Sequence, residues 1–278
     1  KDENGKPAAG AHVAVEILNM AEFFPAAVMI ADADGEVRMT LGLGDIRVRA
    51  FDGIRRAEAM MRIEEEDSLE LVLQEGNHAG IVYCSTTKQV DETARLLQSR
   101  GIRAAAYHAK LDADTRRRNQ DDFLYDRVQV MVATNAFGMG IDKPNVRFVI
   151  HYNMPKDLES YYQEAGRAGR DGQPSRCTLL YSGTDVRTIR FFIDKELEAD
   201  NGLPADVKAE AARKAEERLK YMTFYSTTPR CLRGFLLSYF GEAAPQKCGN
   251  CSNCLLAEQA AEQVEQQAAQ ARERAAAS

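Results

Sequence analysis

GIVYCSTTKQVDETARLLQSRGIRAAAY, residues 80–107, is the stretch that decides the fold. Its first five residues are an apolar run typical of a strand that is buried on both faces. Residues 88–100 carry apolar side chains at helical spacing, and Gly101 directly after them is suited to end a helix. Residues 103–107 are a second short apolar run. The stretch therefore predicts a strand, a helix and a strand, the unit from which parallel sheets are built.

The same alternation continues for another seventy residues. Three further apolar runs predict strands at residues 128–133, 146–152 and 177–181. Helices are expected from Asp112, a suitable N-cap residue, to Leu124, and over residues 157–168. We therefore expect an α/β lobe within residues 51–200, in which helices cover both faces of a parallel sheet.

The composition changes after residue 201. Residues 205–222 are charged and have helical spacing, and residues 231–240 predict a second helix. The two helices can pair as a hairpin in a small module at residues 201–256. Residues 257–278 are almost entirely Ala, Gln and Glu with a few Arg, which favours helix but offers little apolar surface to bury. We expect an exposed helical tail there.

The first fifty residues give weaker signals. Residues 13–24 fit a helix and residues 26–31 a short strand, whereas the Asp-Ala-Asp-Gly of residues 32–35 interrupts the pattern. Residues 1–10 are polar and predict disorder. No independent domain is predicted from residues 1–50.

The overall composition is that of an ordinary globular protein, with 45% hydrophobic and 28% charged residues. No apolar run approaches the roughly 18 residues that span a bilayer, so we expect a cytosolic protein. The net charge of -6 argues against a uniformly basic coat for nucleic acid. Residues 86–118 nevertheless hold eight Lys/Arg against four Asp/Glu, which predicts either a local basic face or a solvated helix surface.

Four of the six cysteines lie close together in the sequence, at Cys231, Cys248, Cys251 and Cys254. Two successive Cys-x-x-Cys steps let three thiolates converge on one ion, and Cys231 comes from the upstream helix to complete a tetrahedron. Four protein ligands leave no open position, so the predicted zinc is structural. Two disulfides are the alternative, which requires an oxidising compartment. Cys84 and Cys177 lie in apolar runs, and we expect both to be buried.

A second signal is QEAGRAGRDG, residues 163–172, at the end of the helix expected at residues 157–168. Arg167 and Arg170 are three residues apart, so on a helix they share one face and direct two permanently charged groups the same way. That arrangement suits phosphate oxygens, and Gly166 and Gly169 permit the close approach of a ligand or another chain. For two isolated arginines, an ion-paired surface cluster is the alternative.

A third signal is ATNAFGMGIDKP, residues 133–144, directly after a predicted strand. This position places Thr134 and the glycines at the carboxyl edge of the sheet, where open α/β folds bind ligands. Thr134 and backbone N–H groups suit a phosphodiester, and Asp142 can accept a hydrogen bond from a hydroxyl group. A glycine-rich connection that binds no ligand is the alternative.

Together these segments resemble the RecQ family of superfamily two DNA helicases. The resemblance covers about residues 51–254 and rests on residues 81–85, 107–111, 133–147 and 163–172 and on the cysteine spacing, in this order. DEAD-box RNA helicases share the lobe, but their sixth motif begins with a His-Arg pair where this chain has Gln163, and they lack the cysteine module. The resemblance implies a RecA-like motor lobe, the second of the enzyme, at residues 51–200 and a RecQ-type zinc-binding helical hairpin at residues 201–256. Residues 1–50 would be a remnant of the first lobe or a poorly ordered segment.

The resemblance also implies roles for single residues. Arg170 would be the arginine finger that reaches the ATP γ-phosphate, and Gln163 and Arg167 would couple the nucleotide to lobe movement. Gly140 and Asp142 would line the nucleotide side of the same cleft. Five residues would hold the tracking DNA strand through its phosphates: Ser85, Thr86, His108, Thr134 and Lys143.

The implied function is an ATP-dependent 3′-5′ DNA helicase that acts on single-stranded and forked DNA in recombination and repair. The resemblance also implies a cytoplasmic, nucleoid-associated bacterial enzyme, with zinc as a structural cofactor and ATP with Mg²⁺ as the substrate pair. The chain contains no G-x-x-x-x-G-K-[ST] loop and no Asp-Glu-x-His box, which in the family belong to the first lobe. By itself it is therefore expected to hydrolyse ATP poorly. A non-catalytic DNA-binding or regulatory zinc module that has lost the motor is the alternative.

The sequence departs from the family pattern at several positions. Residues 30–34 lack the threonines of the Thr-Ala-Thr-Ala motif that ends the first lobe, and residues 53–55 replace an Arg-Pro-Asn. Lys110 stands in place of the glycine in the Tyr-His-Ala-Gly-Leu motif. Residues 255–278 are too few and too simple in composition for the winged-helix domain that the family often carries.

Overall fold

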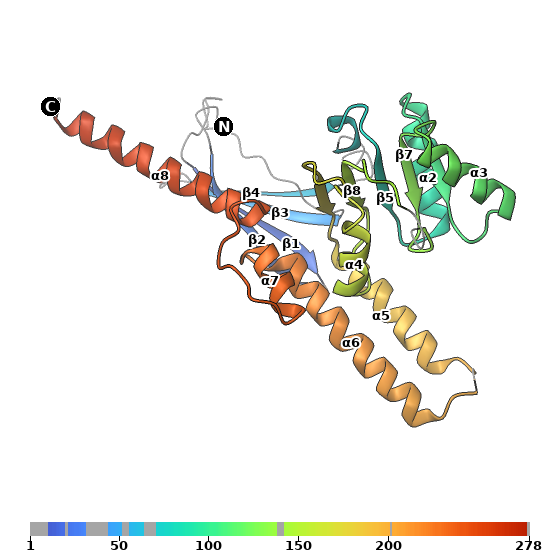
Figure 1. Cartoon of the computed structure of the whole chain (residues 1–278). Coiled ribbons are helices and arrows are strands. Elements are labelled where there is room, and N and C mark those ends of the chain that lie inside the picture. The colour runs from blue at the N-terminus through green and yellow to red at the C-terminus, as the bar shows by residue number, and fades with distance from the viewer. Residues whose placement is uncertain are drawn as a thin grey trace.

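The computed structural model describes residues 11–19, 22–31, 44–51, 56–63, 71–137, 142–200 and 202–276 (Figure 1). Five parallel strands form one sheet in the order β6-β7-β5-β8-β9. The strands are β5 (Gly80–Tyr83), β6 (Ala104–Tyr107), β7 (Val130–Ala133), β8 (Phe148–His151) and β9 (Arg176–Leu179). In the centre, Ile81 lies opposite Met131 on one side and Val149 on the other. The parallel α/β sheet predicted from the sequence is confirmed.

The central strands β5, β7 and β8 are buried along their whole length, because helices or connecting segments cover both faces of the sheet. Helix α2 (Thr87–Ser99) buries Leu97 beside Val82 of β5 in one apolar cluster. Helix α3 (Ala113–Leu124) buries Phe123 beside Ile81 in the other. Neighbouring residues of a strand point to opposite faces, so the two clusters lie on the two sides of the sheet.

The helix ends follow the local sequence. Asp112 caps α3 as predicted, since its Oδ1 accepts a hydrogen bond from Thr115 N at 2.8 Å. Helix α2 ends just before Gly101, whose φ of +79° is accessible to glycine at little cost. Helix α4 (Leu158–Ala165) is shorter than the helix predicted over residues 157–168. The following residues form turns that include Gly169 at a φ of +65°, a value that does not occur in a right-handed helix.

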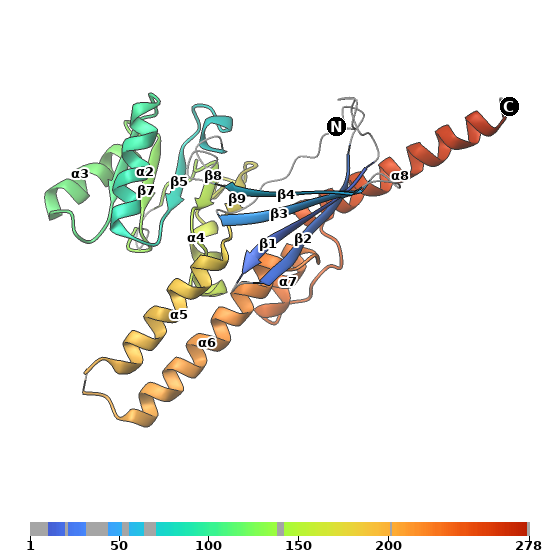
Figure 2. The ribbon, with the colours of Figure 1, turned by 180° about the vertical axis from the view of Figure 1, so that it is seen from behind.

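A third apolar cluster joins the lobe to a group of helices. These are α5 (Gly183–Glu198), α6 (Ala205–Thr227) and α7 (Leu232–Tyr239), and they meet α4 around Leu158, Leu219 and Met222. Helices α5 and α6 run side by side as a long hairpin, which both views show (Figures 1 and 2). The predicted helices at residues 205–222 and 231–240 are confirmed, and α6 packs against both α5 and α7.

The sequence prediction missed α5, although a local signal for it exists. Ser182 and Asp185 form a capping box, in which the Ser182 side chain accepts from the backbone N–H of Thr184 and the Asp185 carboxylate accepts from Ser182 N. Val186, Ile189 and Ile193 then follow at helical spacing and pack into the third cluster. The helical module therefore starts earlier than the change in composition after residue 201 indicates.

The tail is helical, as predicted. Helix α8 (Ser252–Ala276) begins inside the cysteine cluster and projects beyond the other elements (Figure 1). Leu255 and Leu256 near its start are each about two-fifths exposed, at 42% and 41%. None of the helices that the structure describes is both long enough and apolar enough to cross a membrane.

The N-terminal region is a separate antiparallel sheet with the strand order β2-β1-β3-β4. Its strands are β1 (His12–Asn19), β2 (Glu22–Ile30), β3 (Gly44–Phe51) and β4 (Arg56–Ile63). The helix predicted over residues 13–24 is wrong. Val13, Val15 and Ile17 alternate with period two, which fits a strand, and β1 pairs with β2 on one side and β3 on the other. The strand predicted at residues 26–31 falls largely within β2.

Two predictions for this end of the chain are not settled by the fold. The disorder predicted for residues 1–10 lies outside the described residues. Strands β3 and β4 pair across the boundary that we placed between residues 50 and 51. The assignment of residues 1–50 to a first lobe stays a prediction.

Candidate metal centre and nucleic-acid interface

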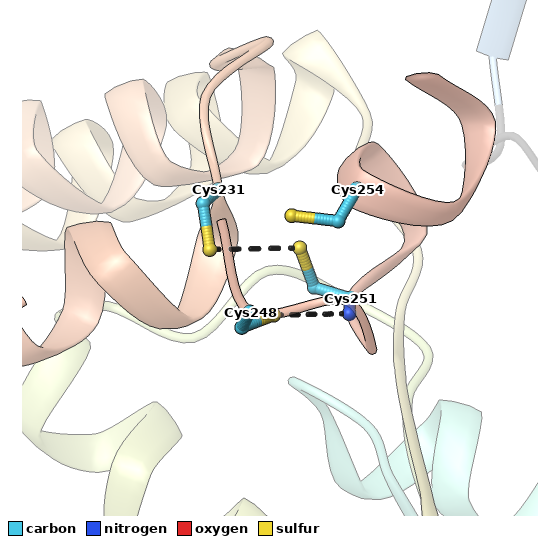
Figure 3. A group of neighbouring side chains, drawn as sticks. All are labelled: Cys231, Cys248, Cys251 and Cys254. Atoms are coloured by element: carbon cyan, nitrogen blue, oxygen red, sulfur yellow. Dashed lines mark hydrogen bonds between the residues drawn. The ribbon is translucent and has the colours of Figure 1, made fainter. Parts of the chain in front are cut away.

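The four clustered cysteines converge on one point (Figure 3). Their Sγ atoms all lie within 4.8 Å of one another, and those of Cys231 and Cys251 are 4.0 Å apart. A Zn–S bond of about 2.3 Å places the sulfurs of a tetrahedral site about 3.8 Å apart, so the observed spacing fits a zinc ion at the centre. Cys231 comes from the N-cap of α7 and Cys254 from the first turn of α8. The geometry thus brings together all four predicted ligands.

Backbone N–H groups point at three of the sulfurs. Leu232 N donates to Cys251 Sγ at 3.4 Å, Gly234 N to Cys231 Sγ at 3.3 Å and Cys251 N to Cys248 Sγ at 3.2 Å. Such donors stabilise thiolates, which are the form that binds metal.

The thiols of the cluster differ in pKa. Burial raises the pKa of Cys231 to about 11. Burial acts the same way on Cys251, but N–H donors from Cys254 and Leu232 outweigh it and lower the pKa of Cys251 to about 6. The donors around Cys251 thus favour its thiolate, and a divalent cation at the centre of the cage would favour the ionised, metal-binding form of its ligands.

Two residues outside the ligand set shape the cysteine cage. The Asn253 Nδ2 donates to the carbonyl oxygens of Thr228 and Arg230, each at 2.7 Å, and so ties the start of α8 to the turn before α7. At Gly234 a Cβ atom would lie 2.4 Å from the Pro245 carbonyl oxygen. Only glycine allows the segment that leads to Cys248 to approach α7 this closely.

The other two cysteines lie apart from the cage. Cys84 is buried as expected, but Cys177 is exposed, so the prediction of a second buried thiol is wrong. Cys177 belongs to β9, the edge strand of the sheet, where fewer neighbours cover the chain.

The predicted phosphate-binding segment follows α4. Arg167 and Arg170 lie in turns rather than on one helical face, because α4 ends at Ala165. The backbone there is anchored, since Gly169 N donates to Val146 O at 2.9 Å and Arg147 forms a bidentate pair with Asp171. The Arg147 guanidinium holds the pKa of Asp171 below its usual value.

The structure brings Arg170 and Asp142 together, two residues that were predicted for the nucleotide cleft. Arg170 Nη1 donates to Asp142 Oδ1 at 3.0 Å, and the side chains are 37% and 86% exposed. Gln163 is also exposed on the same part of the chain. Gly140, predicted for the same cleft, lies outside the described residues.

Arg167 is half-buried and lies near Tyr83 at the end of β5. Burial raises the pKa of Tyr83, and the nearby Arg167 guanidinium partly opposes this. The neighbouring Glu164 is buried, and its Oε2 lies 2.8 Å from His151 Nε2, within hydrogen-bonding distance. Sequence reasoning missed this pair, because nothing local indicates that His151 faces α4.

The residues predicted to contact the DNA strand come directly after three adjacent β-strands of the sheet, at the carboxyl ends of these strands. Ser85 and Thr86 follow β5, His108 follows β6 and Thr134 follows β7. Backbone bonds join these ends, from Thr134 N to Tyr107 O at 3.2 Å and from Cys84 N to Ala133 O at 2.9 Å. Ser85 and Thr86 are exposed and Thr134 is partly exposed, so one edge of the sheet carries hydroxyl groups that suit phosphate.

Two of the residues predicted to contact DNA are not accessible at this edge of the sheet. His108 is only 3% exposed and its Nε2 lies 3.1 Å from Asp91 Oδ1. Lys143 is also 3% exposed, and its Nζ donates to Asp126 Oδ1 at 2.7 Å. Because burial removes both side chains from solvent, the structure does not support a direct DNA contact by either.

A series of hydrogen bonds holds the backbone at Ser85 in place. The sequence did not indicate these bonds. Ser85 N donates to Asn153 Oδ1 at 3.0 Å, and Asn153 Nδ2 donates to Asp185 Oδ1 at 3.2 Å. Burial raises the pKa of Asp185 to about 6, while donors from Met154, Asn153 and Ser182 act against it. The loop after β5 is thus tied to the first turn of α5.

Comparison with known proteins matches two family models along the chain. The model described as "Helicase conserved C-terminal domain" matches residues 64–172, and that described as "RecQ zinc-binding" matches residues 183–255. The second match begins at the start of α5, which we had placed in the preceding lobe.

Several known helicases are similar to this chain in sequence. The ATP-dependent DNA helicase RecQ of Bacillus subtilis is 48% identical over 185 residues, which cover 66% of this chain and 30% of that protein. The ATP-dependent DNA helicase RecQ of Haemophilus influenzae is 40% identical over 191 residues, 68% of this chain and 29% of that protein. An ATP-dependent helicase of Saccharomyces cerevisiae is 42% identical over 180 residues, 64% of this chain and 12% of that protein.

The matched segment thus spans less than a third of the length of these relatives. The two family-model matches contain four strands of the parallel sheet, β5 to β8, the turn with Arg170 and the cysteine cage. The chain belongs to the RecQ family of helicases and carries the helicase conserved C-terminal domain and the RecQ zinc-binding domain.

Proposed function

We propose that this chain is the second motor lobe and zinc module of an ATP-dependent 3′-5′ DNA helicase. The complete protein would act in the cytoplasm on single-stranded and forked DNA during recombination and repair. The names of the relatives support this, because those in Bacillus subtilis and Haemophilus influenzae are ATP-dependent DNA helicases. The alternative, a regulatory zinc module without a motor, is not favoured by these relatives.

The observation that carries the proposal is the placement of Arg170. Its guanidinium is partly exposed at the end of an anchored turn, with the highly exposed Asp142 carboxylate as its partner. An ion pair this exposed contributes only about 0 to 1 kcal/mol, so exchanging Asp142 for a phosphate costs little. The bonds of Gly169 and Asp171 keep the backbone in place while the side chain changes partner.

Different residues of the chain would contact the nucleotide and the DNA. Arg170 would stabilise the charge on a transferring phosphoryl group, and Gln163 would sense the nucleotide beside it. ATP and Mg²⁺ supply the phosphoryl transfer itself, and their binding loop belongs to the first lobe. Ser85, Thr86 and Thr134 would hold a DNA strand by its phosphates, which does not depend on base sequence.

The test is the replacement Arg170→Ala in the complete two-lobed protein. Loss of an arginine finger should lower DNA-stimulated ATP hydrolysis by a factor on the order of 10³ and leave nucleotide and DNA affinity nearly unchanged. Arg213→Ala is a matched control, because Arg213 is an exposed, ion-paired arginine on α6. It should leave hydrolysis unchanged.

Two results would contradict the assignment. Equal losses of hydrolysis and DNA affinity in Arg170→Ala would make Arg170 a structural residue. Unchanged hydrolysis would mean that Arg167 or another group supplies the finger.

A further inference from the structure

Hydrogen bonds to buried and capping residues of the lobe hold the turn that follows β6. Leu111 N donates to His108 O at 3.2 Å, which closes a turn over residues 108–111. His108 is buried and fastened to Asp91 of α2, and Asp112 directly after the turn caps α3. The turn is therefore fixed at both ends, and His108 shapes it instead of facing solvent.

Ala109 and Lys110 of this turn are exposed, and Lys110 is the charged one. The Lys110 side chain is exposed. Its φ is not positive, because in the described part of the chain Asp126 is the single non-glycine residue with a positive φ, so the backbone at Lys110 does not require glycine or asparagine. Across those same residues Lys110 Nζ has no ion-pair partner within 4 Å. Two other lysines of the lobe differ, because Lys88 pairs with Glu92 and Lys143 is buried against Asp126.

Lys110 lies at the edge of the sheet that carries the exposed hydroxyl groups. Its turn leaves β6, whose end is bonded to Thr134 at the end of β7, and β7 is bonded in turn to the end of β5 before Ser85. Neighbouring strands are about 4.8 Å apart, so the three strand ends cover about 10 Å. A flexible ammonium group at one end of this row adds positive charge to a row of neutral hydroxyl groups.

We propose that Lys110 binds a backbone phosphate of the single strand that lies along the ends of β6, β7 and β5. This inference rests on the proposed DNA-binding function and gives the strand a cationic contact at a position where the related family has glycine. The contact is one ion pair with a phosphate, so it adds affinity without base preference.

The test is a salt titration of this chain with a fluorescent oligothymidylate, followed by anisotropy between about 50 and 200 mM salt. Lys110→Gln removes the charge and keeps a flexible polar side chain that is one atom shorter, and Lys110→Arg keeps the charge. Arg100→Gln is the matched control, because Arg100 is exposed after α2, at the opposite end of the sheet. Zinc content and circular dichroism verify that each variant is folded.

The expected result is specific to Lys110. In Lys110→Gln the slope of log affinity against log salt should become shallower by about 0.7, and affinity at low salt should fall on the order of fivefold. Lys110→Arg and Arg100→Gln should retain the slope of the unaltered chain. An unchanged slope in Lys110→Gln, or an equal loss in Arg100→Gln, would overturn the assignment of Lys110 alone. Absence of salt-dependent binding in the unaltered chain would instead overturn the proposed function, and the inference with it.

Discussion

The lobe and the zinc module of this chain are held together in different ways. In the lobe, β5, β7 and β8 are buried at every residue, and apolar clusters lie on both faces of the sheet. From Thr228 to Glu262 the buried residues are Cys231, Gly234 and Cys254. Two of these are ligands of the cage and the third lets the cage close. We therefore expect a segment with so few buried apolar side chains to depend on a metal ion for its fold.

The two regions nevertheless share a boundary. Half-buried side chains of α7, among them Leu232, Phe235 and Tyr239, pack against the third cluster, which also contains Leu158 of α4. The Tyr239 hydroxyl donates to Glu159 Oε1 at 2.8 Å. Whether the module and the lobe unfold together or separately therefore depends on the strength of this boundary relative to the cage.

Removal of the metal should have the largest effect. Structural zinc contributes about 10 kcal/mol or more to the folding of small modules, so Cys254→Ser should abolish zinc binding and unfold the cage. Hydrogen exchange should then become fast in α7 and the start of α8 and stay slow in β5, β7 and β8. Cys177→Ser is the control, because this exposed thiol lies outside the cage.

Metal analysis of the unaltered, reduced protein should give about one zinc per chain. Less than half an equivalent would contradict the zinc assignment. Loss of exchange protection throughout the sheet in Cys254→Ser would show that lobe and module form one cooperative unit.

A cavity in the lobe should have the next largest effect. Phe123 is fully buried between α3 and the sheet, so Phe123→Ala should lower the free energy of unfolding by about 3 to 5 kcal/mol. Tyr125→Ala, two residues away and 69% exposed in the unaltered chain, should cost under about 0.5 kcal/mol. Denaturant titration measures both, and Phe123→Ala should retain its zinc. Metal loss in Phe123→Ala would show that the cage relies on the lobe.

The boundary itself should respond to pH through Asp185. Burial raises the pKa of Asp185 to about 6, above the value of about 3.9 of an unfolded chain. The folded state therefore binds this proton more tightly, and the stability it provides is fully present below about pH 4 and lost as the pH rises through about 6. The loss should be on the order of 3 kcal/mol.

Asp185→Asn should remove this pH dependence, seen as a difference from the unaltered chain in denaturant titrations at pH 4 to 7. Asp194→Asn is the control, because Asp194 is exposed on the same helix. A parallel pH dependence in the unaltered chain and Asp185→Asn would show that the pKa of this carboxyl group is not raised in the folded protein.

What the sequence could predict depended on whether the signal was local. The strands around Ile81 and the cage of Cys248, Cys251 and Cys254 were predictable, because an apolar run and the spacing of metal ligands are visible within a few consecutive residues. The capping box of α5 is an equally local signal for the start of a helix. The helix prediction over residues 13–24 is wrong for β1 and the start of β2, because a short apolar run fits either period, whereas the strand prediction at residues 26–31 falls largely within β2.

The exposure of single charged residues could not be predicted in this way. Lys143 and His108 are buried because Asp126 and Asp91, 17 residues away from each in the sequence, come to lie beside them in the fold. The pairing of Arg170 with Asp142 likewise joins positions 28 residues apart. Residue types at the site were thus predictable, whereas their partners required the folded arrangement.

The position of Cys254 in the first turn of α8 has a mechanical consequence. The 25 residues of α8 at about 1.5 Å each make a rod about 37 Å long, and one of the four sulfurs of the cage is part of its base. Asn253 fastens the same turn to the loop before α7. A tilt of about 10° at the cage moves the far end of such a rod by about 6 Å. A change in the geometry of the cage would therefore change the direction of α8 and displace its far end.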